Sequence, residues 1–109
     1  MNKEFPSHPG KILQNHLFEP RGLTIEQIAQ DLHIPFQELK ELIEGKSSIT
    51  ANLAYRLGLY FKVGAEGFLN LQQIYDLECW KRKEKVDVIE KEIRPYQGEV
   101  NDFQFKPSL

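Results

Sequence analysis

GLTIEQIAQDLHIPFQELKELIEGKSSIT, residues 22–50, has the pattern of two short helices joined by a tight turn. Thr24 suits the N-cap of the first helix, and Gln27, three residues on, matches the reciprocal position of a capping box. The apolar residues of that helix share one face: Ile28, Ala29 and Leu32. The alanine on this face allows a second helix to cross closely. The pattern indicates a helix-turn-helix.

The turn of this motif is centred on His33, where a helix-turn-helix usually has glycine because the backbone there is left-handed. Histidine is among the few other residue types enriched at positive φ, so we expect His33 in the left-handed region. Pro35 suits the first turn of the second helix, and Gly45 suits its end. An apolar stripe predicts the buried face of this helix: Leu39, Leu42 and Ile43.

The opposite face and one flank of the second helix carry the candidate base-reading residues: Phe36, Gln37, Lys40 and Glu41. Glutamine pairs with adenine, glutamate accepts from cytosine, lysine reaches guanine or a phosphate, and an aromatic ring covers a thymine methyl group. In a DNA-reading helix-turn-helix this face enters the major groove. The alternative is a helical hairpin in an ordinary all-α domain, for which DNA is not needed.

The residues after Gly45 form a candidate phosphate site at the start of the next helix. Thr50 suits the N-cap of that helix, which has its own apolar stripe: Leu53, Ala54, Leu57 and Phe61. Free amides at a helix start can bind phosphate, together with side chains of this loop: Lys46, Ser47, Ser48 and Thr50. The alternative is an ordinary capped surface turn.

The charge of this region counts against DNA binding by a single copy of the chain. Residues 1–64 contain seven basic and seven acidic side chains, so this part of the chain has no net positive charge. Most DNA-binding modules are basic, because neutralising phosphates supplies much of the affinity. We therefore expect weak binding to double-stranded DNA unless the few cations converge or two copies bind together, and a homodimer is part of the prediction.

The chain has 109 residues, 40% of them hydrophobic, and a formal net charge of −2, which suits a single folded domain. It has no apolar run long enough to span a membrane and no secretory signal, so we expect a cytoplasmic protein with no membrane partner. The single Cys79 has no thiol partner, and the three histidines lack metal-binding or hydrolase spacing. We expect no catalytic residues, metal or cofactor.

Two further helices complete the expected bundle. Residues 9–18 have an apolar helical face that must end before Pro20. The segment from about Ala65 to Lys81 or beyond is apolar on more than one side, which is more than a small core covers. We expect this fifth helix to form a dimer interface through five residues: Phe68, Leu71, Ile74, Tyr75 and Trp80. Burial under the C-terminal tail is the alternative.

A C-terminal extension, residues 81–109, follows the domain formed by residues 1–80. We interpret the basic run at its start as solvated, because cations complement the dipole at a helix C-terminus. Helical spacing then continues through three apolar residues: Val86, Ile89 and Ile93. The last residues, including Phe103 and Phe105, show no clear period and are either a docking tail or flexible.

Five motifs in unbroken order resemble those of HigA-type (VapI-like) antitoxins: HPGKIL (8–13), GLTIEQIA (22–29), EGKSSIT (44–50), RLGLYF (56–61) and LNLQQIYDLE (69–78). This family belongs to the Cro/repressor-like (XRE) helix-turn-helix group. The first and last motifs distinguish the family from the wider group. The chain departs from the family pattern in having His33 at the turn and acidic residues on the recognition helix.

The resemblance implies an all-α, five-helix repressor-like bundle that dimerises through its C-terminal region and binds a palindromic operator in its own promoter. It also implies a protein partner, a HigB-type toxin that cleaves messenger RNA. The protein would then be both an antitoxin and an autorepressor. No motif marks residues that contact the toxin. Two alternatives stay open: a protein-interaction module of this fold with weak or no DNA binding, and an orphan regulator without a toxin.

Overall fold

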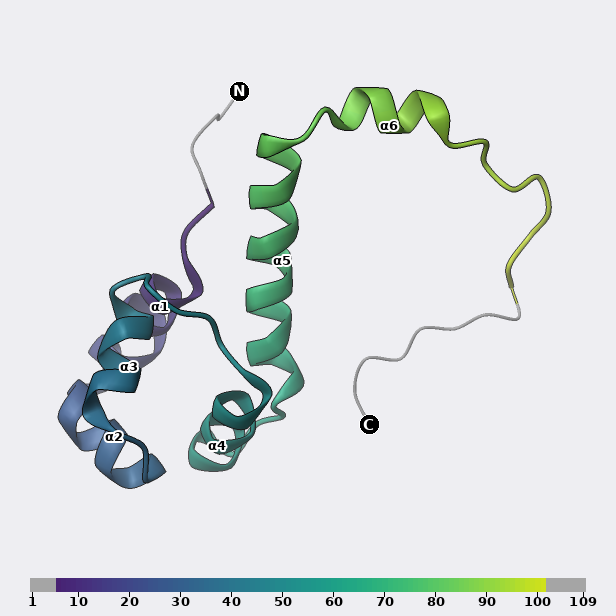
Figure 1. The fold of residues 1–109 in the computed structure, drawn as a ribbon. Helices are drawn as coiled ribbons and strands as arrows, with labels where there is room; N and C mark the ends of the chain where they lie inside the picture. Colours follow the sequence, from purple (N-terminus) through teal and green to yellow (C-terminus); the bar gives the residue numbers. More distant parts are fainter. Residues whose placement is uncertain (1–5, 102–109) are drawn as a thin grey trace.

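The computed structural model describes residues 6–101, and all regular structure in this range is helical (Figure 1). The elements in chain order are α1 (Pro9–Ile12), the π-helical η1 (Leu13–Phe18), the 3₁₀ turn η2 (Glu19–Arg21), α2 (Ile25–Leu32), α3 (Phe36–Ile43), α4 (Ala51–Phe61), α5 (Glu66–Lys83) and α6 (Val86–Glu92). The predicted all-α helix-turn-helix fold is confirmed. None of the helices in residues 6–101 combines the length and the apolarity that crossing a membrane requires.

The first helix begins at the His-Pro-Gly sequence. The Nδ1 atom of His8 accepts a hydrogen bond from the amide of Gly10 at 2.9 Å, so the side chain caps α1, and Pro9 takes the first helical position. The helix continues through η1, where the amide of Glu19 donates to the carbonyl of Gln14. The predicted helix over residues 9–18 is therefore present, with a π-helical second half.

The backbone of α1 lies directly against the C-terminal turn of α3. A Cβ atom built on Gly10 would lie 1.9 Å from the carbonyl oxygen of Leu42 and 3.0 Å from the Cα of Ile43. No side chain fits in that space, because real Cβ contacts are never so short. Glycine at position 10 is thus required for two helices to meet backbone to backbone.

The helix-turn-helix has the predicted local structure. Thr24 caps α2 by accepting a hydrogen bond from the amide of Gln27 at 3.1 Å. His33 has φ 60° and ψ 47°, which confirms the left-handed turn. The reciprocal half of the capping box was wrong: the Gln27 side chain donates to the Asp31 carboxylate one turn on, at 3.1 Å.

The core gathers the predicted apolar faces of α2, α3 and α4 beneath α1, η1 and α5. Its buried side chains are Leu13, Phe18, Ile28, Ala29, Leu32, Leu39, Leu42, Ile43, Ile49, Leu53, Ala54, Leu57 and Phe68. The inclusion of Phe68 corrects its prediction as a dimer-interface residue. Only 7% of Phe68 is exposed, because the first turn of α5 packs into the domain.

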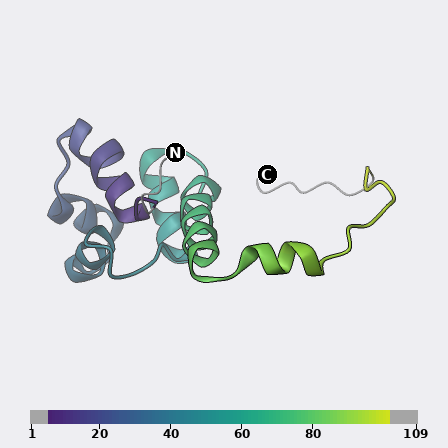
Figure 2. The same ribbon diagram turned by 90° about the horizontal axis from the view of Figure 1, so that it is seen from above.

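The C-terminal part of the described chain lies away from this core. Figures 1 and 2 show α6 projecting beyond the end of α5, and residues 94–101 continue without helical structure. The predicted helical spacing is confirmed, since α6 begins at Val86 and Ile93 is its C-cap. Phe103 and Phe105 lie outside the described residues.

Replacing Gly10 by alanine should lower the free energy of unfolding by about 3 kcal/mol, because α1 and α3 would have to separate to admit the methyl group. Gly67→Ala is the matched control. A Cβ on Gly67 has nothing within 4 Å, so alanine there should leave stability unchanged or raise it by about 0.5 kcal/mol. Urea unfolding of both variants measures this. Equal effects of the two substitutions would contradict the close contact.

Candidate nucleic-acid interface

The exposed face of α3 carries the predicted base-reading residues. Leu39 is fully buried, so this helix is oriented as the sequence predicts. Phe36 is 41% exposed and Gln37 is exposed, while Lys40 and Glu41 are half-buried. The four side chains therefore share an accessible helical surface. Their contacts with bases stay a prediction.

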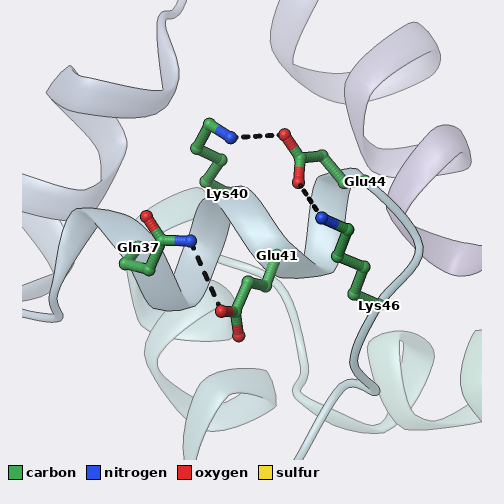
Figure 3. A network of polar contacts seen from close by, with 5 residues as sticks. All are labelled: Gln37, Lys40, Glu41, Glu44 and Lys46. Carbon is green, nitrogen blue, oxygen red and sulfur yellow. Dashed lines mark hydrogen bonds and ion pairs between the residues drawn. The ribbon is translucent and has the colours of Figure 1, made fainter.

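The polar side chains of this face pair with one another (Figure 3). Gln37 donates its side-chain amide to Glu41 at 3.3 Å. The ammonium groups of Lys40 and Lys46 lie 2.5 Å and 3.3 Å from different oxygens of Glu44. The two lysines hold the pKa of Glu44 below its usual range, because their hydrogen bonds favour its ionised form.

The loop after α3 brings the residues that are predicted to bind phosphate to the start of α4. Gly45 has φ 82°, and the amide of Lys46 donates to the carbonyl of Glu41 at 2.8 Å, which closes the C-terminus of α3. Thr50 caps α4 by accepting from the amide of Leu53 at 3.1 Å, as predicted. Ser48 is exposed and Ser47 half-buried. Phosphate binding by this loop stays a prediction.

One residue that holds this loop was not identified from the sequence. The buried side chain of Gln72 on α5 accepts a hydrogen bond from the amide of Ile49 at 2.8 Å and donates to Asp76 at 2.9 Å. The Ile49 amide is therefore already paired and is not a free phosphate donor. The available signal was spacing, because Gln72 follows Phe68 by four residues and so shares its buried helix face.

Two contacts brace the C-terminus of α2 against α4. Arg56 donates to the last α2 carbonyl, that of Leu32, at 2.8 Å, where a cation also complements the helix dipole. Tyr60 donates its hydroxyl to Asp31 at 2.7 Å. This hydrogen bond, with a second from Gln27, lowers the pKa of Asp31, and it raises the pKa of Tyr60. The braces set the position of the turn at His33.

The outer face of α5 leaves three large apolar side chains exposed. Ile74 is 62%, Leu77 51% and Trp80 45% exposed. The other predicted interface residues face their own chain: Leu71 packs against the core, and the Tyr75 ring lies edge-on to His8 at 5.0 Å. Only the exposed residues of α5 are therefore available for a dimer contact, and that contact stays a prediction.

The part of the chain that the structure describes holds no cluster of three side chains able to bind a metal ion. Cys79 is half-buried, and its interaction with the Tyr75 hydroxyl, together with burial, raises the pKa of Tyr75. This pair belongs to the packing of α5.

Known proteins resemble this chain in sequence and architecture, although no protein-family model matches it. Virulence-associated protein I of Dichelobacter nodosus is 35% identical over 88 residues, which cover 79% of this chain and 82% of the relative. A solved antidote protein of the HigA family from Coxiella burnetii is 38% identical, with a TM-score of 0.74 over 85% of this chain and all of that one. The antitoxin HigA of Pseudomonas aeruginosa, solved with the higBA promoter, is 30% identical, with a TM-score of 0.73 over 83% of this chain and 97% of that one.

Replacing Gln72 by alanine should cost about 1–3 kcal/mol of unfolding free energy, because the Ile49 amide loses its partner in a buried position. Amide hydrogen exchange at Ile49 should become faster. Gln73→Ala is the matched control, since Gln73 is the exposed neighbour on the same helix. Unchanged protection of the Ile49 amide in the Gln72 variant would contradict its anchoring role.

Proposed function

Because this chain belongs to the HigA family of helix-turn-helix antitoxins, we propose that it is a sequence-specific repressor of its own promoter and the antitoxin of a HigB-type toxin. Its relatives are antitoxins and transcription regulators, and the protein is not an enzyme. The observation that carries the proposal is the exposed face of α3, displayed on the fold of an antitoxin solved with promoter DNA.

In this proposal α3 enters the major groove of the operator. Gln37, Lys40 and Glu41 read base edges, and Phe36 covers a thymine methyl group. Lys46, Ser47, Ser48 and Thr50 contact phosphates beside the groove. The operator-binding unit is the predicted domain of residues 1–80 extended to Lys83, because α5 continues to that residue, and residues 84–109 take the place of the predicted extension of residues 81–109.

The binding unit of the proposal is a homodimer. Residues 1–64 have no net charge, so a single copy gains little from phosphate neutralisation. Two copies place two α3 helices in successive major grooves, about 34 Å apart. The exposed apolar residues of α5 supply a surface for the pairing, namely Ile74, Leu77 and Trp80.

The toxin partner rests on family membership. No described contact marks a toxin-binding surface, so the proposal assigns no residue to it. Co-expression tests it directly: the chain should restore growth to cells that express a HigB-type toxin, and persistent growth arrest at equal protein levels would exclude the pairing.

A second candidate function is a protein-interaction module with weak or no DNA binding. One observation favours it: Lys40 and Lys46, the cations of the α3 face and the loop after it, are both held by Glu44. The two functions differ in salt response. Operator binding weakens steeply with salt, whereas association through an apolar surface does not.

The protein should bind its own upstream DNA in preference to a scrambled duplex, and more tightly at about 50 mM than at 200 mM salt, as fluorescence anisotropy can show. Gln37→Ala should relax discrimination at one base pair, at a cost of about 1–3 kcal/mol. Lys46→Ala should weaken binding to all DNA sequences alike and make the affinity less dependent on salt. No preference for the upstream DNA at either salt concentration would move the assignment to the protein-interaction module.

Ile74→Glu should shift the protein from dimer to monomer in sedimentation velocity, because a charge would enter an apolar contact between two copies of α5. Its operator affinity should fall by about tenfold or more, since each half-site would bind alone. Asn15→Glu adds the same charge at an exposed site of η1 and should leave the dimer intact. An unaffected dimer in the Ile74 variant would exclude this face as the interface.

A further inference from the structure

Residues 36–50, which form α3 and the loop after it, are the recognition surface, and the two cations of this surface pair with one carboxylate. Lys40 and Lys46 are the only basic residues between positions 36 and 50, and each pairs with a different oxygen of Glu44. Figure 3 shows Glu44 lying between the two ammonium groups. In the free protein, therefore, both ammonium groups that the surface can offer to DNA are already paired, and the single negative charge of Glu44 offsets one of their two positive charges.

The backbone explains why one side chain reaches both lysines. Lys40 precedes Glu44 by one helical turn, a spacing that places the two side chains next to each other on the helix surface. Glu44 caps α3, its amide donating to the Lys40 carbonyl at 2.9 Å. Gly45 then turns the chain in the left-handed region and returns Lys46 to the other side of the carboxylate. The arrangement is built into the end of α3 and is independent of a partner.

We propose that Glu44 competes with DNA phosphate for Lys40 and Lys46, and so lowers both the operator affinity of the protein and the salt dependence of binding. This inference rests on the proposed operator-binding function. An ammonium group has three donors, so a lysine that contacts a phosphate either keeps its ion pair with Glu44, which brings the carboxylate close to the phosphate, or leaves that pair. In the second case the carboxylate faces the phosphates unpaired or takes up a cation from solution, and each of these outcomes opposes binding.

The competition persists at neutral pH. The neighbouring lysines lower the pKa of Glu44, so its charge is lost only in acid below the usual range of a glutamate. Glu41 does not share this role, because it accepts from the neutral side chain of Gln37. Glu44 is therefore the acidic residue of this surface whose removal releases cations.

Glu44→Gln tests the proposal, because glutamine keeps the size of the side chain and removes its charge. Operator binding at about 50 mM salt should become about tenfold tighter, and the slope of log K against log salt should steepen by about one to two units. The matched control is Glu38→Gln, which removes the same charge from an exposed site of α3 that pairs with neither lysine. This control should tighten binding by about twofold or less, without a change of slope.

The double variant Glu44→Gln, Lys46→Ala should lose most of the gain in affinity and slope, since one released cation is missing. Thermal unfolding and sedimentation of each variant show whether fold and dimer are intact. If the unmodified protein binds its operator but the Glu44 and Glu38 variants behave alike, this inference is overturned and the proposed function stands. If no variant binds the operator, the proposed function itself fails. Binding acquired only by the Glu44 variant would support the competition.

Discussion

The contact between the backbones of α1 and α3 at Gly10 is the constraint on which the recognition surface depends. The carbonyl of Leu42 occupies the space where any side chain at position 10 would lie. His8, on the same short segment, caps α1 and places its ring against Tyr75 of α5. A Cβ on Gly45 would also lie 3.7 Å from that ring. The His-Pro-Gly sequence thus joins the first helix, the end of α3 and α5 at one point.

A second constraint holds the loop that follows α3. The loop between α3 and α4 is fastened to α5 through the Ile49 amide and the buried side chain of Gln72. Because the loop after α3 is attached to α5, the helix proposed to read DNA and the helix proposed to pair two copies are mechanically linked. Displacement of α5 in a dimer would move the loop that is proposed to contact phosphates.

Local features were predictable because each depends on residues within a few positions of one another. The left-handed turn at His33 and the N-caps at Thr24 and Thr50 follow from backbone geometry and nearby donors. Helical periodicity likewise identified the buried face of α3. Periodicity failed on α5, since that helix is apolar on several sides and gave no indication that Phe68 faces the core while Ile74 faces outward.

The amino-acid sequence alone establishes the helix-turn-helix, the order of the helices and the residue types displayed on α3. Only the tertiary structure decides three further matters: that Gly10 contacts Leu42, that Gln72 holds Ile49, and that Glu44 occupies both lysines. The first two join residues more than twenty positions apart, and no local pattern records which distant partners meet. The third depends on a left-handed glycine that reverses the chain, which places Lys46 beside a carboxylate two residues away.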